Sequence, residues 1–434
     1  MVELKRIRNY NGDYAPFSMF ESIVIECTDA NIFGRTQIGV EFKLLGCLRI
    51  LGRGAHCDDV AEILDVGKTT VNDMFKAFVK NYSAAYYDVY VYVPEGEEMD
   101  QVVADYTKMG LPAGYVGSMD VTHVMWKQCP STLRHVCTGR YHCPSVAFQM
   151  VCAHTRRIHH VSRPFYGATN DISITYNDSY PRDVMNGSVH QDRIFRTYDR
   201  EGVILLWRGA YLICDGGYPK CVSFVDPTLM DYEYLTVSWA EWLESVRRDV
   251  ERLFGALKMR FRWISKAIEY KDIETLGYAV KVAAILHNRL LQYDNFDVFN
   301  WEKMDPNRND FEDEETEEEK QEIGEGQPAV KDLLPIVEDL PGPQDLSASV
   351  TILNADFPVH AAVKPKLRLQ NQKEGVVEVE EEDNPIAEVQ QWVLKDALRK
   401  HFSYAYSNGQ ISWPKRFTNF QKRAMPLLMV RIKC

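Results

Sequence analysis

The sequence predicts an α/β fold in which a mixed sheet is flanked by helices, with a mainly helical region ahead of the sheet. Short runs rich in Val, Ile, Tyr, Phe and Cys are typical of strands, and they lie at 115–124, 145–152, 158–165 and 211–214. Apolar residues at helical spacing follow these runs from 238 to 293 and also precede them. Strands followed by helices favour a sheet that is covered on its faces.

The chain has 434 residues, enough for roughly two or three domains. Its pattern divides it into a helical region at 1–110, a sheet domain with its helices at 111–300, an acidic linker at 301–384 and a C-terminal segment at 385–434. Helical spacing over 385–402 predicts that the segment after the linker is folded.

The net charge of −12 is concentrated in two runs. Residues 302–327 carry a net charge of −9 and residues 373–383 carry −5, which leaves the rest of the chain at about +2. Such runs are usually solvated and disordered. The acidity therefore does not exclude a DNA partner.

Several protein classes are excluded or disfavoured. The most apolar stretch, 278–291, is interrupted by Lys281, His287 and Arg289, so a membrane-spanning helix is not expected. No apolar segment follows the basic residues at the N-terminus, and we therefore expect no secretory signal and a reducing compartment. None of the ten cysteines has C-x-x-C spacing, which removes the strongest zinc and redox signatures.

Within the helical region, two apolar patterns with a break between them resemble a helix-turn-helix. In this interpretation residues 58–59 begin the first helix and Gly67 makes the turn. Residue 69 or 70 then opens a recognition helix that carries Asn72 and Lys76. A plain helical hairpin in a core is the alternative, because the unit carries more acids than most recognition modules.

Three acidic residues stand out for their setting. Asp120 lies in an otherwise apolar strand, where a carboxylate is costly to bury unless it is paired or binds a metal. Asp215 directly follows the run 211–214, at a strand end of the kind where sites gather in open sheets. Glu251 lies at the edge of the apolar stripe of a helix, from which its carboxylate can reach such a site. The structural alternatives are a helix N-cap for Asp215 and a surface ion pair for Glu251.

Carboxylates that converge from two strands and a helix suit Mg²⁺ or Mn²⁺ far better than zinc. In two-metal phosphoryl transfer, ions about 3.5–4 Å apart activate the attacking oxygen and stabilise the leaving one. Seven Lys and Arg residues against three acids between 244 and 266 would supply phosphate contacts for a polyanionic substrate. The predicted DNA-binding residues among them are Arg247, Arg248, Lys258, Arg260 and Arg262.

Five strings occur in one order between residues 36 and 293, and together they resemble the PIF/Harbinger superfamily of transposases and their DDE endonuclease domain. The strings are MDVTHVMW around Asp120, FYGATNDISI around Asp171, YLICDGGYP around Asp215, VRRDVERLFGALKMRFR around Glu251, and AAILHNRLL.

The resemblance implies that Asp120, Asp215 and Glu251 are the D, D and E of an RNase H-like catalytic core that holds two Mg²⁺ or Mn²⁺ ions. It implies cleavage of double-stranded DNA at transposon ends, followed by attack of the freed 3′ hydroxyl on target DNA. Many relatives have His-Asp where this chain has Asn-Asp, which makes Asp171 an auxiliary candidate. His123 is a second one, although an ordinary structural histidine is an equal alternative.

The resemblance also implies a homo-oligomer and a separately encoded Myb-like DNA-binding protein. Such a partner brings the transposase to the transposon ends and into the nucleus, whereas the chain alone would stay cytoplasmic. The two acidic runs are docking surfaces for a basic partner or merely solvated spacers.

Two rival functions remain, a domesticated non-catalytic DNA-binding or scaffold protein in the nucleus and a metal-dependent phosphatase that acts on small substrates. The basic stretch after Glu251 speaks against the phosphatase. His287 and Asn288 are predicted to be a pair of polar residues inside a core whose hydrogen-bonding groups are satisfied, and Cys214 is predicted to be a buried small hydrophobe. A zinc site is disfavoured because its candidate ligands match no finger spacing; these are Cys129, Cys137, His142 and Cys143.

Overall fold

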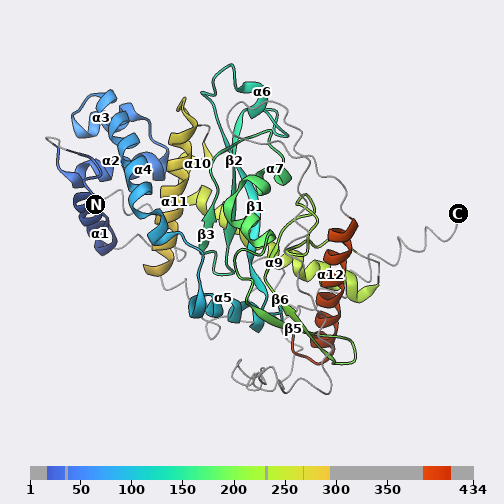
Figure 1. Cartoon of the computed structure of the whole chain (residues 1–434). Helices are drawn as coiled ribbons and strands as arrows, with labels where there is room; N and C mark the ends of the chain where they lie inside the picture. Colours follow the sequence, from blue (N-terminus) through green and yellow to red (C-terminus); the bar gives the residue numbers. More distant parts are fainter. Residues whose placement is uncertain (1–16, 35–37, 230–232, 267, 294–384, 412–434) are drawn as a thin grey trace, which may run out of the picture.

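The computed structural model shows a mixed sheet flanked by helices, as the sequence predicts (Figure 1). It describes residues 17–34, 38–229, 233–266, 268–293 and 385–411. Across these ranges, no helix is both long enough and apolar enough to cross a membrane. The predicted acidic linker lies outside the described residues.

Five helices precede the sheet: α1 (Phe17–Asp29), α2 (Val40–Arg53), α3 (Cys57–Leu64), α4 (Lys68–Tyr90) and α5 (Gly96–Lys108). α3 and α4 are the two helices of the predicted helix-turn-helix, and Gly67 lies in the link 65–67 between them, but α4 begins at Lys68 rather than at residue 69 or 70. Gly67 has an ordinary φ of −69° and precedes α4 as its N-cap, while Asp65 at the end of α3 adopts the left-handed φ of 54°. Asp tolerates this conformation better than most residues. Contact of this unit with DNA stays a prediction.

The main sheet has the strand order β3-β2-β1-β7-β8, and β4 pairs with β2. Its strands are β1 (Tyr115–Met125), β2 (Ser145–Cys152), β3 (Ile158–Val161), β4 (Phe165–Tyr166), β7 (Tyr211–Ile213) and β8 (Phe224–Val225). β1, β2 and β3 are antiparallel, whereas β7 runs parallel to β1 and to β8. The single strand predicted at 158–165 is thus two strands, because Pro164 between them cannot donate to a ladder.

A separate two-stranded sheet consists of β5 (Ile194–Tyr198) and β6 (Ile204–Arg208). The remaining helices are α6 (Arg134–Cys137), α7 (Asp171–Asn177), α8 (Ser179–Met185), α9 (Tyr234–Arg260), α10 (Arg262–Ser265), α11 (Ile273–Tyr293) and α12 (Pro385–Ser407).

Helices cover both faces of the main sheet, which explains why its strands read as nearly continuous apolar runs. On one face, Val124 packs in a core with Leu253 of α9 and residues of α11. On the other face, Val121 packs in a second core with Ile174 of α7 and Tyr180 of α8. Since side chains alternate along a strand, Asp120 lies on the same face as Val124, under α9.

The helical region at 1–110 shares a hydrophobic core with the sheet domain. Buried residues of α1–α4 belong to the same hydrophobic cluster as those of α9, α11 and the strands β1 and β2. Phe75 of α4, for example, packs against Trp263 of α10 with ring centroids 5.8 Å apart. Figure 1 shows α1–α4 gathered beside α11, at one side of the sheet.

The C-terminal helix α12 is folded, and it packs on the sheet domain. Phe402 lies against Trp242 of α9 with ring centroids 5.0 Å apart. Lys395 of α12, which is buried, places its Nζ 3.1 Å from the carboxylate of buried Asp226, just after β8. The described part of the C-terminal segment therefore completes the core near β5 and β8. Figure 1 shows α12 beside β5.

Candidate active site

The parallel pairing of β1 and β7 brings two of the predicted acids to one level of the sheet. Ser118 of β1 lies opposite Ile213, the last residue of β7. Asp120 and Asp215 each come two residues later on these neighbouring strands. Both side chains are partly buried. The strand end after β7 thus lies beside the middle of β1, where a third acid joins the two.

That third acid is Asp171, the first residue of α7, and it faces Asp215 across Gly217. A Cβ built on Gly217 would lie 3.2 Å from Asp215 Oδ1 and 3.4 Å from Asp171 Oδ2. The Gly217 N–H donates to Asp215 Oδ1 at 2.8 Å, and the Asn170 side chain caps α7 by accepting from the Ser173 N–H at 2.7 Å. The cap fixes where the helix begins and therefore where Asp171 stands.

The three aspartates influence one another electrostatically. Burial raises the pKa of Asp120 to about 7; the N–H of Val121 and Arg247 oppose this rise, and the charges of Asp215 and Asp171 add to it. Burial, followed by the charge of Asp215, also raises the pKa of Asp171. Carboxylates that disfavour one another's ionisation in a partly buried cluster are typical of functional sites.

Glu251 does not join this cluster, because it forms an ion pair with Arg247. Glu251 Oε1 lies 2.7 Å from Arg247 Nη2, and its side chain is 46% exposed. The same guanidinium bonds Glu244 and approaches Asp120 Oδ2 at 3.8 Å. The ion pair that the structural alternative for Glu251 predicts is therefore present.

The oxygen atoms that these three aspartates offer are ligands of the type that a hard cation prefers. Asp120, Asp171 and Asp215 offer only oxygen ligands, and their mutual repulsion would be relieved by positive charge. Within the described ranges, however, no three side chains among His, Cys, Asp and Glu are grouped so that they could hold an ion together. Glu251, in particular, would have to leave Arg247 to do so.

The predicted DNA-binding residues divide by burial. Arg248 and Arg262 are exposed, whereas Arg247 and Arg260 are buried, and Arg260 Nη1 lies 2.8 Å from His287 Nδ1. Arg247 precedes Val250 by three residues and Arg260 follows Leu257 by three, so each lies beside an apolar core position. This spacing is visible in the sequence. Because the Arg260 side chain is buried and contacts His287, a phosphate contact by Arg260 is unfavourable in this fold.

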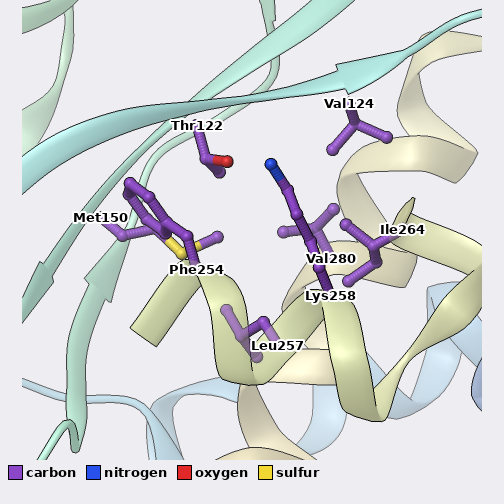
Figure 2. Close-up of a pocket in the computed structure, with 8 residues that line it drawn as sticks. All are labelled: Thr122, Val124, Met150, Phe254, Leu257, Lys258, Ile264 and Val280. Atoms are coloured by element: carbon purple, nitrogen blue, oxygen red, sulfur yellow. The ribbon is translucent and has the colours of Figure 1, made fainter. Parts of the chain in front are cut away.

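Lys258 lies on the same face of β1 as Asp120. Its side chain extends from α9 toward Thr122 in a small cavity that is also lined by Val124 and Ile264 (Figure 2). Burial lowers the pKa of its amine. Whether this amine contacts a phosphate stays a prediction.

His123 makes the contacts of a structural histidine. Its Nδ1 lies 3.1 Å from Ser145 Oγ, and its ring meets Tyr141 edge-on at 5.0 Å. Burial lowers its pKa to about 4, and Arg140 and Lys258 add to this. Arg140 is an exposed cation whose charge opposes the rise in the pKa of Asp171. It was not predicted as a site residue, because no feature of the loop sequence distinguishes it.

The predicted polar pair on α11 is confirmed. His287 and Asn288 are fully buried, and Asn288 donates to the carbonyls of Ile158 and Tyr90 at 2.8 Å each. Cys214 is buried, as expected of a small hydrophobe.

Gly217 offers a direct probe of the aspartate cluster. We expect Gly217→Ala to weaken Mn²⁺ binding by about tenfold, because the added methyl crowds the carboxylates of Asp215 and Asp171. The matched control is Gly216→Ala, whose added Cβ would meet only Thr228 Oγ1 at 3.4 Å. Titration with Mn²⁺ measures both variants, and equal affinities would show that the two carboxylates do not form a cation site.

Comparison with known proteins gives one match. A family model described as "Plant transposon protein" matches residues 88–297, a range that contains Asp120, Asp171, Asp215 and Glu251. No curated protein matches the chain, and no solved structure does. Residues 88–297 of the chain are thus similar to plant transposon proteins.

Proposed function

We propose that the chain is a transposase that cuts double-stranded DNA at transposon ends and joins the freed 3′ hydroxyl to target DNA. The observation that carries this proposal is the cluster of Asp120, Asp171 and Asp215 beside α9, inside the region similar to plant transposon proteins. Assignment to the PIF/Harbinger superfamily and to an RNase H-like core is part of the proposal. It is supported by Asp120 on β1, by Asp215 just after the neighbouring strand β7, and by a third acid, Glu251, on the helix α9 that covers β1.

We also propose that the reaction depends on Mg²⁺ or Mn²⁺. When bound, such ions activate a water or a 3′ hydroxyl and stabilise the leaving oxygen. The chain's own contribution is to orient the ligands. The Val121 N–H donates to Asp120 Oδ1 at 2.7 Å and the Gly217 N–H to Asp215 Oδ1, so that each carboxylate is fixed by the backbone next to it.

A comparison of substrates tests this function against its rivals. The purified full chain is incubated with labelled duplex DNA in Mn²⁺, in Mg²⁺, in Zn²⁺ and in excess EDTA, and in parallel with a small phosphomonoester. We expect cleavage of DNA in Mn²⁺ and Mg²⁺ only. Full activity in EDTA overturns the metal requirement. Hydrolysis of the small ester alone indicates a phosphatase, and no reaction of either substrate indicates the non-catalytic scaffold.

The exposed cations on and after α9 are proposed to contact phosphates. We expect Arg248→Ala and Arg262→Ala each to weaken binding to all DNA sequences and to reduce the slope of log K against log salt by about one. A suitable control is Arg208→Ala, since Arg208 is an exposed arginine of β6 paired with Asp192. A change in sequence preference without a change in slope would instead assign the residue to base contacts.

A partner is proposed for end recognition and for entry into the nucleus. Specific DNA binding exceeds non-specific binding by roughly 4–10 kcal/mol, and the α3–α4 unit, which carries six acids against three lysines, offers little to provide it. We expect weak, salt-sensitive DNA binding by the chain alone and much tighter binding once a Myb-like protein is added. Gel-shift titration at physiological salt measures this, and nanomolar end-specific binding by the chain alone would show that no partner is needed.

A further inference from the structure

We propose that the α6 loop, defined as residues 126–144 between β1 and β2, holds one nucleotide of the DNA strand next to the aspartates. In this proposal Arg140 binds a phosphate and the ring of Tyr141 stacks on an unpaired base. The inference rests on the proposed function, because it states how the DNA substrate of that function is held. It requires no bound cation.

The α6 loop belongs to a stretch of the chain without negative side chains. From residue 121 to residue 170 the sequence has no Asp or Glu, whereas six residues are Lys or Arg and six are His, in a chain whose net charge is −12. Within the loop, Arg134, His135, Arg140 and His142 are exposed. The stretch marks the region and does not single out one cation. A surface of this charge attracts a polyanion.

Backbone contacts fix the loop beside the start of α7. The Ala168 N–H donates to the Val136 carbonyl at 3.1 Å. A Cβ built on Gly139 would clash with the Gly167 carbonyl, so the two backbones approach each other as closely as a glycine permits. Residues 167 and 168 lead directly to Asp171, the first residue of α7. Figure 1 shows α6 at the top of the view, above α7.

Arg140 and Tyr141, which follow Gly139 in the loop, form one exposed unit. Arg140 Nη2 donates to Tyr141 Oη at 3.1 Å, and the guanidinium carbon lies 5.1 Å from the centre of the tyrosine ring. The tyrosine is 43% exposed, and its ring meets His123 of β1 edge-on with centroids 5.0 Å apart. Because the tyrosine hydroxyl is neutral, this contact does not neutralise the charge of Arg140.

The charge of Arg140 acts on the aspartates and on their surroundings. Burial and the charge of Asp215 raise the pKa of Asp171, and the charge of Arg140 opposes this rise. Burial lowers the pKa of His123 to about 4, and the charges of Arg140 and Lys258 lower it further. A phosphate that Arg140 binds would therefore belong to the part of the strand that lies at the aspartates.

An exposed tyrosine next to an arginine suits a strand whose bases are accessible. Every base has a π face, so stacking on an aromatic ring contributes to binding without reading the sequence. In an intact duplex the bases stack on one another, whereas a base at a strand end or in an opened pair can leave the stack. Arg140 can bind two oxygens of a phosphate, and Tyr141 can hold the base of the same nucleotide.

Two short single strands of equal length test this inference. One consists of thymidine nucleotides, and the other of abasic nucleotides that keep the same phosphates. Binding by the full chain is measured by fluorescence anisotropy at low salt in excess EDTA. We expect the wild type to bind the thymidine strand at least about fivefold more tightly. Tyr141→Ala should lose this preference, and Tyr141→Phe should keep it because phenylalanine retains the ring.

The phosphate contact is tested with the same strands. We expect Arg140→Ala to weaken binding to both strands alike and to reduce the slope of log K against log salt by about 0.7, the value for one contact with a single strand. Tyr234→Ala is the matched control for Tyr141→Ala, since Tyr234 at the start of α9 is 42% exposed. It should leave both affinities unchanged.

Equal binding of the two strands by the wild type overturns the inference, and so does a preference that survives in Tyr141→Ala. Failure of the proposed function looks different. In that case the chain prefers the thymidine strand through Tyr141 but neither cuts nor joins DNA. A wild-type chain that binds neither strand at low salt would contradict both.

Discussion

Asp120→Asn and Asp215→Asn are each expected to lower metal-dependent DNA cleavage at least about a thousandfold, equivalent to roughly 4 kcal/mol of transition-state stabilisation. Asparagine keeps nearly the same volume but removes the negative charge that a cation needs from its ligand. Single-turnover cleavage of labelled duplex DNA in Mn²⁺ measures the effect. Asp192→Asn is the control, since Asp192 is 81% exposed and pairs with Arg208 on β6. A variant with a near-normal rate would remove that residue from the site.

The Asp120→Asn variant is also expected to be at least as stable as the wild type. Its loss of cleavage would then result from the loss of a metal ligand and not from unfolding. The pKa of Asp120 rises from its ordinary value of 3.8 to about 7, chiefly through burial. Between these values the folded chain holds a proton that the unfolded chain has lost, so this group makes stability fall as pH rises through that window. Without the buried charge, the variant should gain on the order of 2 kcal/mol at pH 8 in cation-free buffer.

Thermal unfolding of both proteins between pH 4 and 8 measures this difference. The two should be similar in stability near pH 4 and should diverge as the pH rises. Parallel profiles would show that Asp120 is not buried as a charged group in the cation-free protein.

Arg289→Ala is expected to destabilise the fold by about 3–5 kcal/mol, the range found when one partner of a buried ion pair is removed. Arg289 of α11 is 3% exposed and pairs with Glu26 of α1. It also donates to Tyr82 Oη at 2.9 Å and Ser22 Oγ at 2.8 Å. These contacts join the N-terminal helices to the sheet domain, so both should unfold in one transition at lower urea concentration.

Arg200→Ala provides the comparison for Arg289→Ala. Arg200 pairs with Glu233 at 3.0 Å, but both side chains are about half exposed. Such a surface pair contributes at most about 1 kcal/mol. If urea unfolding gave equally small changes for both variants, the α1–α4 helices would not depend on Arg289 for their attachment.

The sequence indicated where the aspartates lie, because Asp120 interrupts an apolar strand and Asp215 follows one. The sequence did not predict strands in which a side chain that faces the core is polar. In β5, Thr197 is fully buried and accepts a hydrogen bond from Trp207 Nε1 of β6 at 2.9 Å, which breaks the apolar alternation that marks a strand. β8 has only two residues, too few for any periodicity.

Pairings between distant residues were likewise beyond the sequence. Lys395 and Asp226 are separated by 169 positions, and nothing local to either indicates that α12 packs on the sheet domain. The partner of Arg247 was also hidden, because several cations of α9 lie near acids. Only the placement of that helix over β1 decides which of them reaches Asp120.

Joining of DNA ends by the wild-type chain tests the central claim most directly. A pool of labelled duplexes with randomised ends and free 3′ hydroxyls is incubated with supercoiled plasmid in Mn²⁺, with the wild type and with Asp215→Asn, at low salt so that the chain binds DNA without its proposed partner. The proposed transposase links the label covalently to the plasmid, and the variant does not. Absence of joined product with the wild type, or equal joining by Asp215→Asn, would contradict DNA strand transfer at the aspartates of β1, α7 and the end of β7.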